Sequence, residues 1–238
     1  MGKRVTLIFL LCLSIGATSQ YHLEKPVETA IVRNSIQLSF VGDLMAHVEN
    51  LRSRPFGEAF VHVAHALDDV DLTFANFEFV VDPTKPAAGY PRFNAPAEYA
   101  EAAILAGVDV VSLANNHSFD LGIDGVNQTA ASMKRFADLY EIAYSGINAD
   151  TIIDAGPPVL SVLSTESAPR FKITSFESNG FSIGFLAVTS FVNRLIRTDY
   201  VNIADYNRAA DREALLRTIR AARGEYDIFV LSYHGGVE

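Results

Sequence analysis

Polar side chains able to bind a metal ion follow four separate apolar runs of the sequence. Asp43 and Glu78 follow the first two runs, the triplet Asn115-Asn116-His117 follows the third, and His234 follows the last. Any one of these residues alone is typical of a turn or of an ordinary hydrogen bond. Because the carboxyl ends of strands in an open α/β sheet meet in one crevice, four such endings together predict one shared site.

The stretch from Ser112 to Gly122 is the most specific of these segments. It places two asparagines and a histidine at the end of an apolar run, where one asparagine could bind a metal through its amide oxygen. His117 would then stand beside the metal as an acid for a leaving group, and Asp120 is close enough in the chain to orient its ring. The alternative is a helix-capping loop, since Asn and Asp cap helices well.

These residues require strands that end at the same edge of a sheet. Hydrophobic patterning predicts strands over 35–41, 70–74, 108–113, 142–144, 171–176, 181–188 and 227–232, and helices over 60–67, 97–106, 125–140 and 208–223. The segment Ser178-Asn179-Gly180 predicts a hairpin turn. The order of elements predicts a layered α/β fold, largely parallel in its first half, with the antiparallel hairpin added.

Length and composition limit the classes of function. The chain has 238 residues, of which 49% are hydrophobic and 20% charged, so it is long and apolar enough to bury a core. Its net charge of −9 disfavours nucleic acid as a partner, and a single cysteine excludes a disulfide framework. The sequence holds no Walker-type loop, dinucleotide-binding glycine motif or serine-hydrolase elbow, so those classes have no support.

The first residues have the order of a secretory signal. Lys3 and Arg4 precede an apolar run over 5–13 and small residues over 14–19. We expect cleavage after residue 19, a polar tether over 20–35 and an exported domain over 36–238, in the periplasm, at the cell surface or at the membrane. The alternatives are an uncleaved membrane anchor and lipidation of Cys12.

Five motifs give the sequence a family resemblance. They are Phe-Val-Gly-Asp-Leu-Met at 40–45 with His47, Ala-Asn-Phe-Glu at 75–78, Phe-Asn-Ala-Pro at 93–96, the stretch 112–122, and Tyr-His-Gly-Gly-Val-Glu at 233–238. In this order they resemble the capsule-synthesis CapA family, also called poly-γ-glutamate capsule biosynthesis proteins. That family is similar in fold to the calcineurin-type metallophosphoesterases.

The resemblance implies a role for each matching residue. It implies metal ligands Asp43, Glu78 (bridging), Asn116 and His234, a general acid His117 oriented by Asp120, and substrate-binding residues His47, Asn76, Asn115 and Glu238. A donor set of this kind suits two divalent ions of Mn, Zn, Fe or Mg. Two adjacent ions can activate a water and stabilise the attacking and leaving oxygens at phosphorus.

The sequence also departs from the patterns that it resembles. Met45 stands where an Asp-x-His motif would place a ligand, Gly235 stands where Trp is usual, and no Gly-His-x-His segment follows. We therefore expect a C-terminally truncated domain that lacks a ligand and its closing strands, and a chain of weak or no activity.

Three hypotheses of function follow from the resemblance. The first is an exported, metal-dependent phosphoesterase-like hydrolase that acts in making, releasing or exporting an anionic surface polymer such as poly-γ-glutamate. The second is a non-catalytic accessory that binds the nascent polymer or organises a membrane-bound polymer synthase. The third is an inactive fragment.

Overall fold

The structure is a computed structural model that describes residues 35–148, 170–194 and 200–236. The expected signal peptide, nearly all of the tether and Glu238 lie outside these ranges. Four strands, β1 (Leu38–Leu44), β2 (Leu72–Phe77), β3 (Val110–Ser112) and β4 (Ala143–Ser145), form a parallel sheet in that order. The second sheet has the order β5 (Thr174–Ser178), β6 (Phe181–Thr189) and β7 (Ile228–His234). The predicted α/β fold is confirmed.

The helices follow the strands along the chain. After β1 come α1 (Val48–Arg52), the 3-10 helix η1 (Phe56–Ala59) and α2 (Ala64–Asp68), followed after β2 by α3 (Ala97–Leu105), after β3 by α4 (Gly122–Tyr140) and after β6 by α5 (Ala209–Ala222). In the described ranges, no helix combines the length and the apolar character needed to cross a membrane.

Only the second half of the predicted helix over 60–67 is helical. The segment instead holds a turn followed by the short helix α2, and Val61 and Val63 within it are 61% and 48% exposed. Phe56 and Phe60 are buried against the ring of Tyr99, with ring centroids 5.3 and 6.1 Å away. The apolar residues of the segment therefore do not form the single buried face that a long helix requires.

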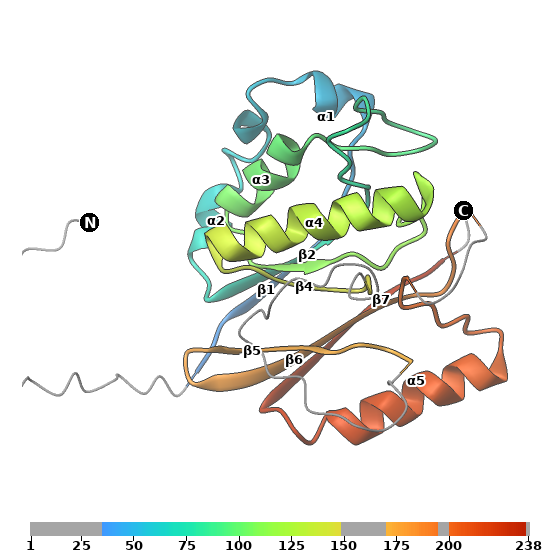
Figure 1. Ribbon diagram of the computed structural model, residues 1–238. Helices are drawn as coiled ribbons and strands as arrows, with labels where there is room; N and C mark the ends of the chain where they lie inside the picture. The colour runs from blue at the N-terminus through green and yellow to red at the C-terminus, as the bar shows by residue number, and fades with distance from the viewer. Residues whose placement is uncertain (1–34, 149–169, 195–199, 237–238) are drawn as a thin grey trace, which may run out of the picture. The chain divides into compact units, whose positions relative to one another are not determined.

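Buried side chains form three clusters that define the layers. Phe77 of β2 joins a cluster with side chains of α3 and α4, whereas Phe74 of the same strand contributes with Phe185 of β6 to a cluster between the two sheets. Leu186 of β6 and Leu215 of α5 belong to the third cluster. Neighbouring residues of a strand point to opposite faces, so β2 and β6 each pack on two sides. Figure 1 shows α4 and α5 on opposite sides of the strands.

Gly146 lets the chain leave β4 close to the loop that follows β3. Its φ is +115°, and an added Cβ would lie 2.5 Å from the backbone nitrogen of Ala114. We expect Gly146→Ala to lower the free energy of unfolding by about 3 kcal/mol, because backbone strain and overpacking add. Gly180→Ala is the control, since Gly180 has a φ of +83° but nothing within 4 Å of the added Cβ. Urea unfolding should show a clearly smaller loss in the control, and equal losses would contradict the steric argument.

An ion pair holds the first turn of α5. Nη1 of Arg170 donates to Oδ1 of Asp211 at 2.7 Å, and Asp211 is only 4% exposed. This hydrogen bond from Arg170 lowers the pKa of the Asp211 carboxyl below its ordinary value of 3.8. The backbone N–H of Asp205 donates to the other carboxylate oxygen at 3.2 Å.

The lowered pKa of Asp211 predicts a pH-dependent contribution to stability. A carboxylate whose pKa is lower in the folded state stabilises the fold above its unfolded pKa, and this stability is lost as the pH falls through the folded pKa. We expect Asp211→Asn to cost about 1–2 kcal/mol at pH 7, and expect the difference from wild type to shrink as the pH falls below 3.8. Urea titrations at pH 7 and pH 3 measure it, and a difference independent of pH would show that the charge is unimportant.

Candidate metal centre

The ends of β1 and β2 bring two acidic residues and one amide together. Asp43 pairs with Asn76 in the parallel register, after an irregularity in β1 between Phe40 and Asp43. Nδ2 of Asn76 donates to Oδ1 of Asp43 at 2.8 Å and to Oε2 of Glu78 at 3.4 Å. The Asp43 side chain is 48% exposed and that of Glu78 only 7%. The site therefore has one carboxylate at the surface and one inside.

His234 reaches this pair from the second sheet. It is the last residue of β7 and pairs with Thr189 of β6. Its Nδ1 lies 3.8 Å from Oδ1 of Asp43, and its Nε2 lies 4.0 Å from Oε1 of Glu78. Nε2 also donates to Oδ1 of Asn116 at 2.8 Å, because an amide oxygen can only accept. The histidine thus joins both sheets and the loop after β3.

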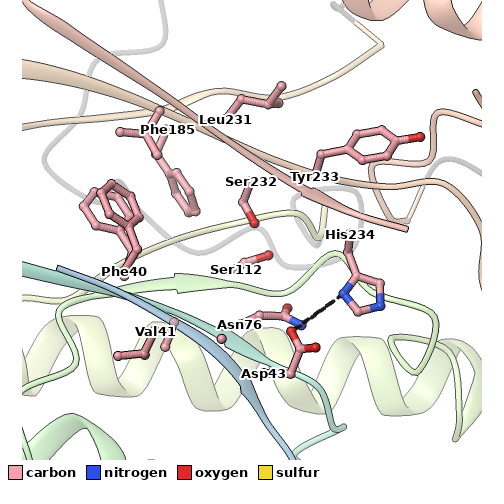
Figure 2. Close-up of a pocket in the computed structure, with 14 residues that line it drawn as sticks. Phe40, Val41, Asp43, Asn76, Ser112, Phe185, Leu231, Ser232, Tyr233 and His234 are labelled. Carbon is pink, nitrogen blue, oxygen red and sulfur yellow. Dashed lines mark hydrogen bonds and ion pairs between the residues drawn. The ribbon is translucent and has the colours of Figure 1, made fainter. Parts of the chain in front are cut away.

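The donor atoms of Asp43, Glu78 and His234 fit a divalent cation. One ligand atom from each of these residues lies within 4.8 Å of the other two. Figure 2 shows Asp43, Asn76 and His234 facing one another at the end of the pocket. Two carboxylates with an imidazole and no sulfur form a donor set suited to Mn, Zn, Fe or Mg. The described residues therefore provide a candidate metal triad, with the amide oxygen of Asn116 next to it.

Asn115 fixes the loop after β3 against β2. Its Nδ2 donates to Oδ1 of Asn76 at 3.2 Å and to the carbonyl oxygen of Phe77 at 2.9 Å. Its Oδ1 accepts the backbone N–H of His117 at 3.1 Å. The residue is 1% exposed. These contacts give Asn115 a positioning role, because it orients the amide of Asn76 whose Nδ2 faces the two carboxylates.

His117 and Asp120 form a buried, hydrogen-bonded pair beside the triad. Nδ1 of His117 lies 2.7 Å from Oδ2 of Asp120, and the same oxygen accepts the backbone N–H of Phe93 at 2.7 Å. Nε2 of His117 lies 4.0 Å from Oε1 of Glu78, so this edge of the ring faces the triad. A carboxylate at Nδ1 holds the ring orientation and leaves Nε2 for proton transfer.

Most of the predicted site residues lie together in the structure. These eight are Asp43, Asn76, Glu78, Asn115, Asn116, His117, Asp120 and His234. His47 is exposed, and its ring contacts that of Phe93, whose ring also contacts His117, with ring centroids 5.0 and 4.6 Å away. Met45 packs against the cluster between the first sheet and its helices. Glu238 lies outside the described residues.

Two contacts of the site were not anticipated from the sequence. The first is the hydrogen bond from the backbone N–H of Phe93 to Asp120. The Phe-Asn-Ala-Pro motif, which begins at Phe93, is a sequence signal that could have indicated it. The segment after β6 also contacts the loop: the N–H of Asn193 donates to the carbonyl oxygen of Asn116 at 2.8 Å, and Nη1 of Arg194 donates to that of Asp120 at 3.3 Å. No residue pattern in the sequence predicts this second contact.

A pocket between the two sheets leads to the candidate metal centre. It is lined by residues of β1, β2, β6 and β7 and by Ser112 of β3, with Asp43 and His234 at its polar end. Phe40 and Phe185 lie at its other end (Figure 2). Phe40 stacks on Phe74 with ring centroids 4.9 Å apart and remains 62% exposed. The polar end of the pocket, at the triad, therefore lies beside apolar walls.

Fold and site together define a layered α/β domain with a candidate metal centre at the carboxyl ends of its strands. A family model described as bacterial capsule synthesis protein PGA_cap matches residues 37–238. The chain therefore belongs to this family of bacterial capsule synthesis proteins. A comparison with curated proteins found no match.

Proposed function

We propose that this capsule synthesis protein is a metal-dependent hydrolase of the metallophosphoesterase type. The observation that supports it most is the approach of Asp43, Glu78 and His234, whose ligand atoms lie within 4.8 Å of one another. The polymer on which it acts would be anionic, such as poly-γ-glutamate, and its role would be the making, release or export of that polymer.

Each residue of the site has a separate role in the proposed hydrolysis. Asp43, Glu78 and His234, with Asn116 beside them, would hold divalent metal. When bound, the metal would stabilise negative charge on a phosphoryl group and activate water. Asn76 holds the carboxylates of Asp43 and Glu78 through its hydrogen bonds, and Asn115 orients the Asn76 amide. Asp120 holds the His117 ring, whose Nε2 donates a proton to the leaving oxygen.

The proposal extends to the surroundings of the protein. The signal-like order of residues 1–19 supports export to the periplasm or the cell surface, and the acidic net charge of −9 argues against nucleic acid as a partner. A membrane-bound polymer synthase is the protein partner that a capsule synthesis role suggests.

One experiment tests the proposed hydrolase directly. The full chain is loaded with Mn²⁺ or Zn²⁺, its metal content is measured, and hydrolysis of an aryl phosphate is compared between wild type and Asn116→Ala. We expect bound metal, and activity that Asn116→Ala lowers. Absence of bound metal, together with activity unaffected by the substitution, would refute the proposal. Bound metal without hydrolysis of a phosphate ester or a γ-glutamyl bond would favour the accessory role.

A further inference from the structure

Helix α5 and its two flanking residues carry an unusual concentration of positive charge. Residues 208–223 hold five arginines, at positions 208, 212, 217, 220 and 223, and two carboxylates, Asp211 and Glu213. This segment thus has a net charge of +3 in a chain whose net charge is −9. All five arginines are exposed. Positive charge gathered on one element of an acidic protein attracts anions to that element.

Most of these arginines can bind an external anion without giving up an ion pair. Nη1 of Arg217 lies 3.7 Å from Oε2 of Glu213, and Arg212 donates to the carbonyl oxygen of Tyr206. Arg220 and Arg223, by contrast, have no ion pair with any carboxylate in the described ranges. An anion can therefore bind them without breaking an internal pair.

Three of the arginines, Arg212, Arg220 and Arg223, lie on one side of the helix, within about 80° of one another at 3.6 residues per turn. Residues three or four apart are neighbours on a helix surface, so Arg220 and Arg223 are adjacent there. Arg212 lies eleven residues before Arg223, which corresponds to about 16 Å along the helix axis. A ligand that contacts both ends of this row must be extended and must carry several negative groups. That description fits a linear polyanion better than a small anion.

The opposite face of α5 is occupied by the protein core. Leu215 is 9% exposed and packs in a cluster with Leu186 and Val188 of β6. An amphipathic helix that inserts at a membrane surface buries its apolar face in the lipid. The outer face of α5 carries one exposed large apolar residue, Leu216, which is 46% exposed. The charge pattern therefore favours a soluble polyanion over a lipid surface.

We propose that the outer face of α5 binds a polycarboxylate chain, with Arg212, Arg220 and Arg223 as its main contacts. Guanidinium groups match carboxylates with paired N–H donors, which makes arginine the better residue for this task than lysine. The inference rests on the proposed function, because the polycarboxylate would be the capsule polymer on which the protein acts. The helix would hold the polymer at a place distinct from the metal triad.

The test measures binding of fluorescently labelled poly-glutamate to the full chain by anisotropy, at low and at physiological salt. We expect Arg220→Gln with Arg223→Gln to weaken binding about tenfold at low salt, and expect salt to reduce the difference. The control is Arg52→Gln with Arg135→Gln, two exposed arginines on α1 and α4 whose loss changes the net charge equally. This control pair should bind nearly as well as wild type.

Each outcome decides for or against the α5 surface. Equal weakening by both pairs would show that net charge alone attracts the polymer, and would overturn the proposal. So would a wild-type chain that binds vesicles of anionic lipid but no poly-glutamate. Aryl phosphate hydrolysis should be unchanged in the α5 variant, whereas Glu78→Gln should lose hydrolysis and still bind the polymer. Failure of the polymer site can therefore be told apart from failure of the hydrolase.

Discussion

Glu78→Gln is expected to lower the affinity of the protein for Mn²⁺ or Zn²⁺ by at least about 100-fold, the upper end of what loss of an outer-sphere partner costs. Glu78 is the buried carboxylate of the triad, and the amide cannot supply its negative charge. Isothermal titration calorimetry measures the affinity. Thermal unfolding provides a second readout, because a metal that binds only the folded state raises the unfolding temperature. Wild type should show this rise and Glu78→Gln should not.

The control for this substitution is Glu177→Gln. Glu177 is an exposed residue of β5, and its replacement by Gln is the same chemical change at a position outside the triad. It should bind metal as wild type does. If both variants bind metal equally well, Glu78 is not a ligand and the proposed centre is wrong. Circular dichroism of both variants accompanies the titration. It shows whether Glu78→Gln is folded without metal, so that a loss of affinity can be attributed to the missing ligand and not to unfolding.

His117→Gln is expected to slow hydrolysis of an alkyl phosphate by about 100- to 10,000-fold, the usual contribution of a general acid. An alkoxide leaves poorly unless it is protonated, whereas a nitrophenolate leaves without help. The loss on 4-nitrophenyl phosphate should therefore be much smaller. This dependence on the leaving group separates proton donation from a merely structural role, which would reduce both rates alike.

The matched control for the general acid is His65→Gln. His65 is exposed on α2, so its loss should change neither rate. Equal reduction of both rates by His117→Gln would contradict the assignment of His117 as the acid. Its buried position beside Asp120 makes a stability measurement necessary for each variant.

The parts of the fold that could be predicted were those with a strong local pattern. Asn179 and Gly180 have φ angles of 52° and 83°, as the Asn-Gly hairpin signal requires. The ends of β1 and β2 were harder to predict, because both strands continue through Asp43 and Asn76 where a turn was expected. Polar residues at strand ends pair through their backbones like any others, so the residue type does not reveal where the strand stops.

The site could be predicted as a set of residues but not as a set of contacts. Asp43, Glu78 and His234 were recognisable from their positions after apolar runs. The role of Asn115 depends on how the loop after β3 packs against β2. The approach of Asn193 and Arg194 to that loop depends on how the second sheet packs on the first. Such contacts join residues distant in the chain through backbone groups, which every residue carries, so the sequence holds no signal for them.

The separation of the ligands along the chain has a consequence for the order of folding. His234 is 158 residues from Asn76 and 118 from Asn116, and it arrives on the last described strand. Contacts between residues distant in the chain require closure of a long loop before they contribute, so they form more slowly than local contacts. The candidate centre should therefore be complete only when β7 has paired with β6. Metal affinity during refolding would then report the pairing of β7, and detachment of β7 alone would release the ion before the rest of the domain unfolds.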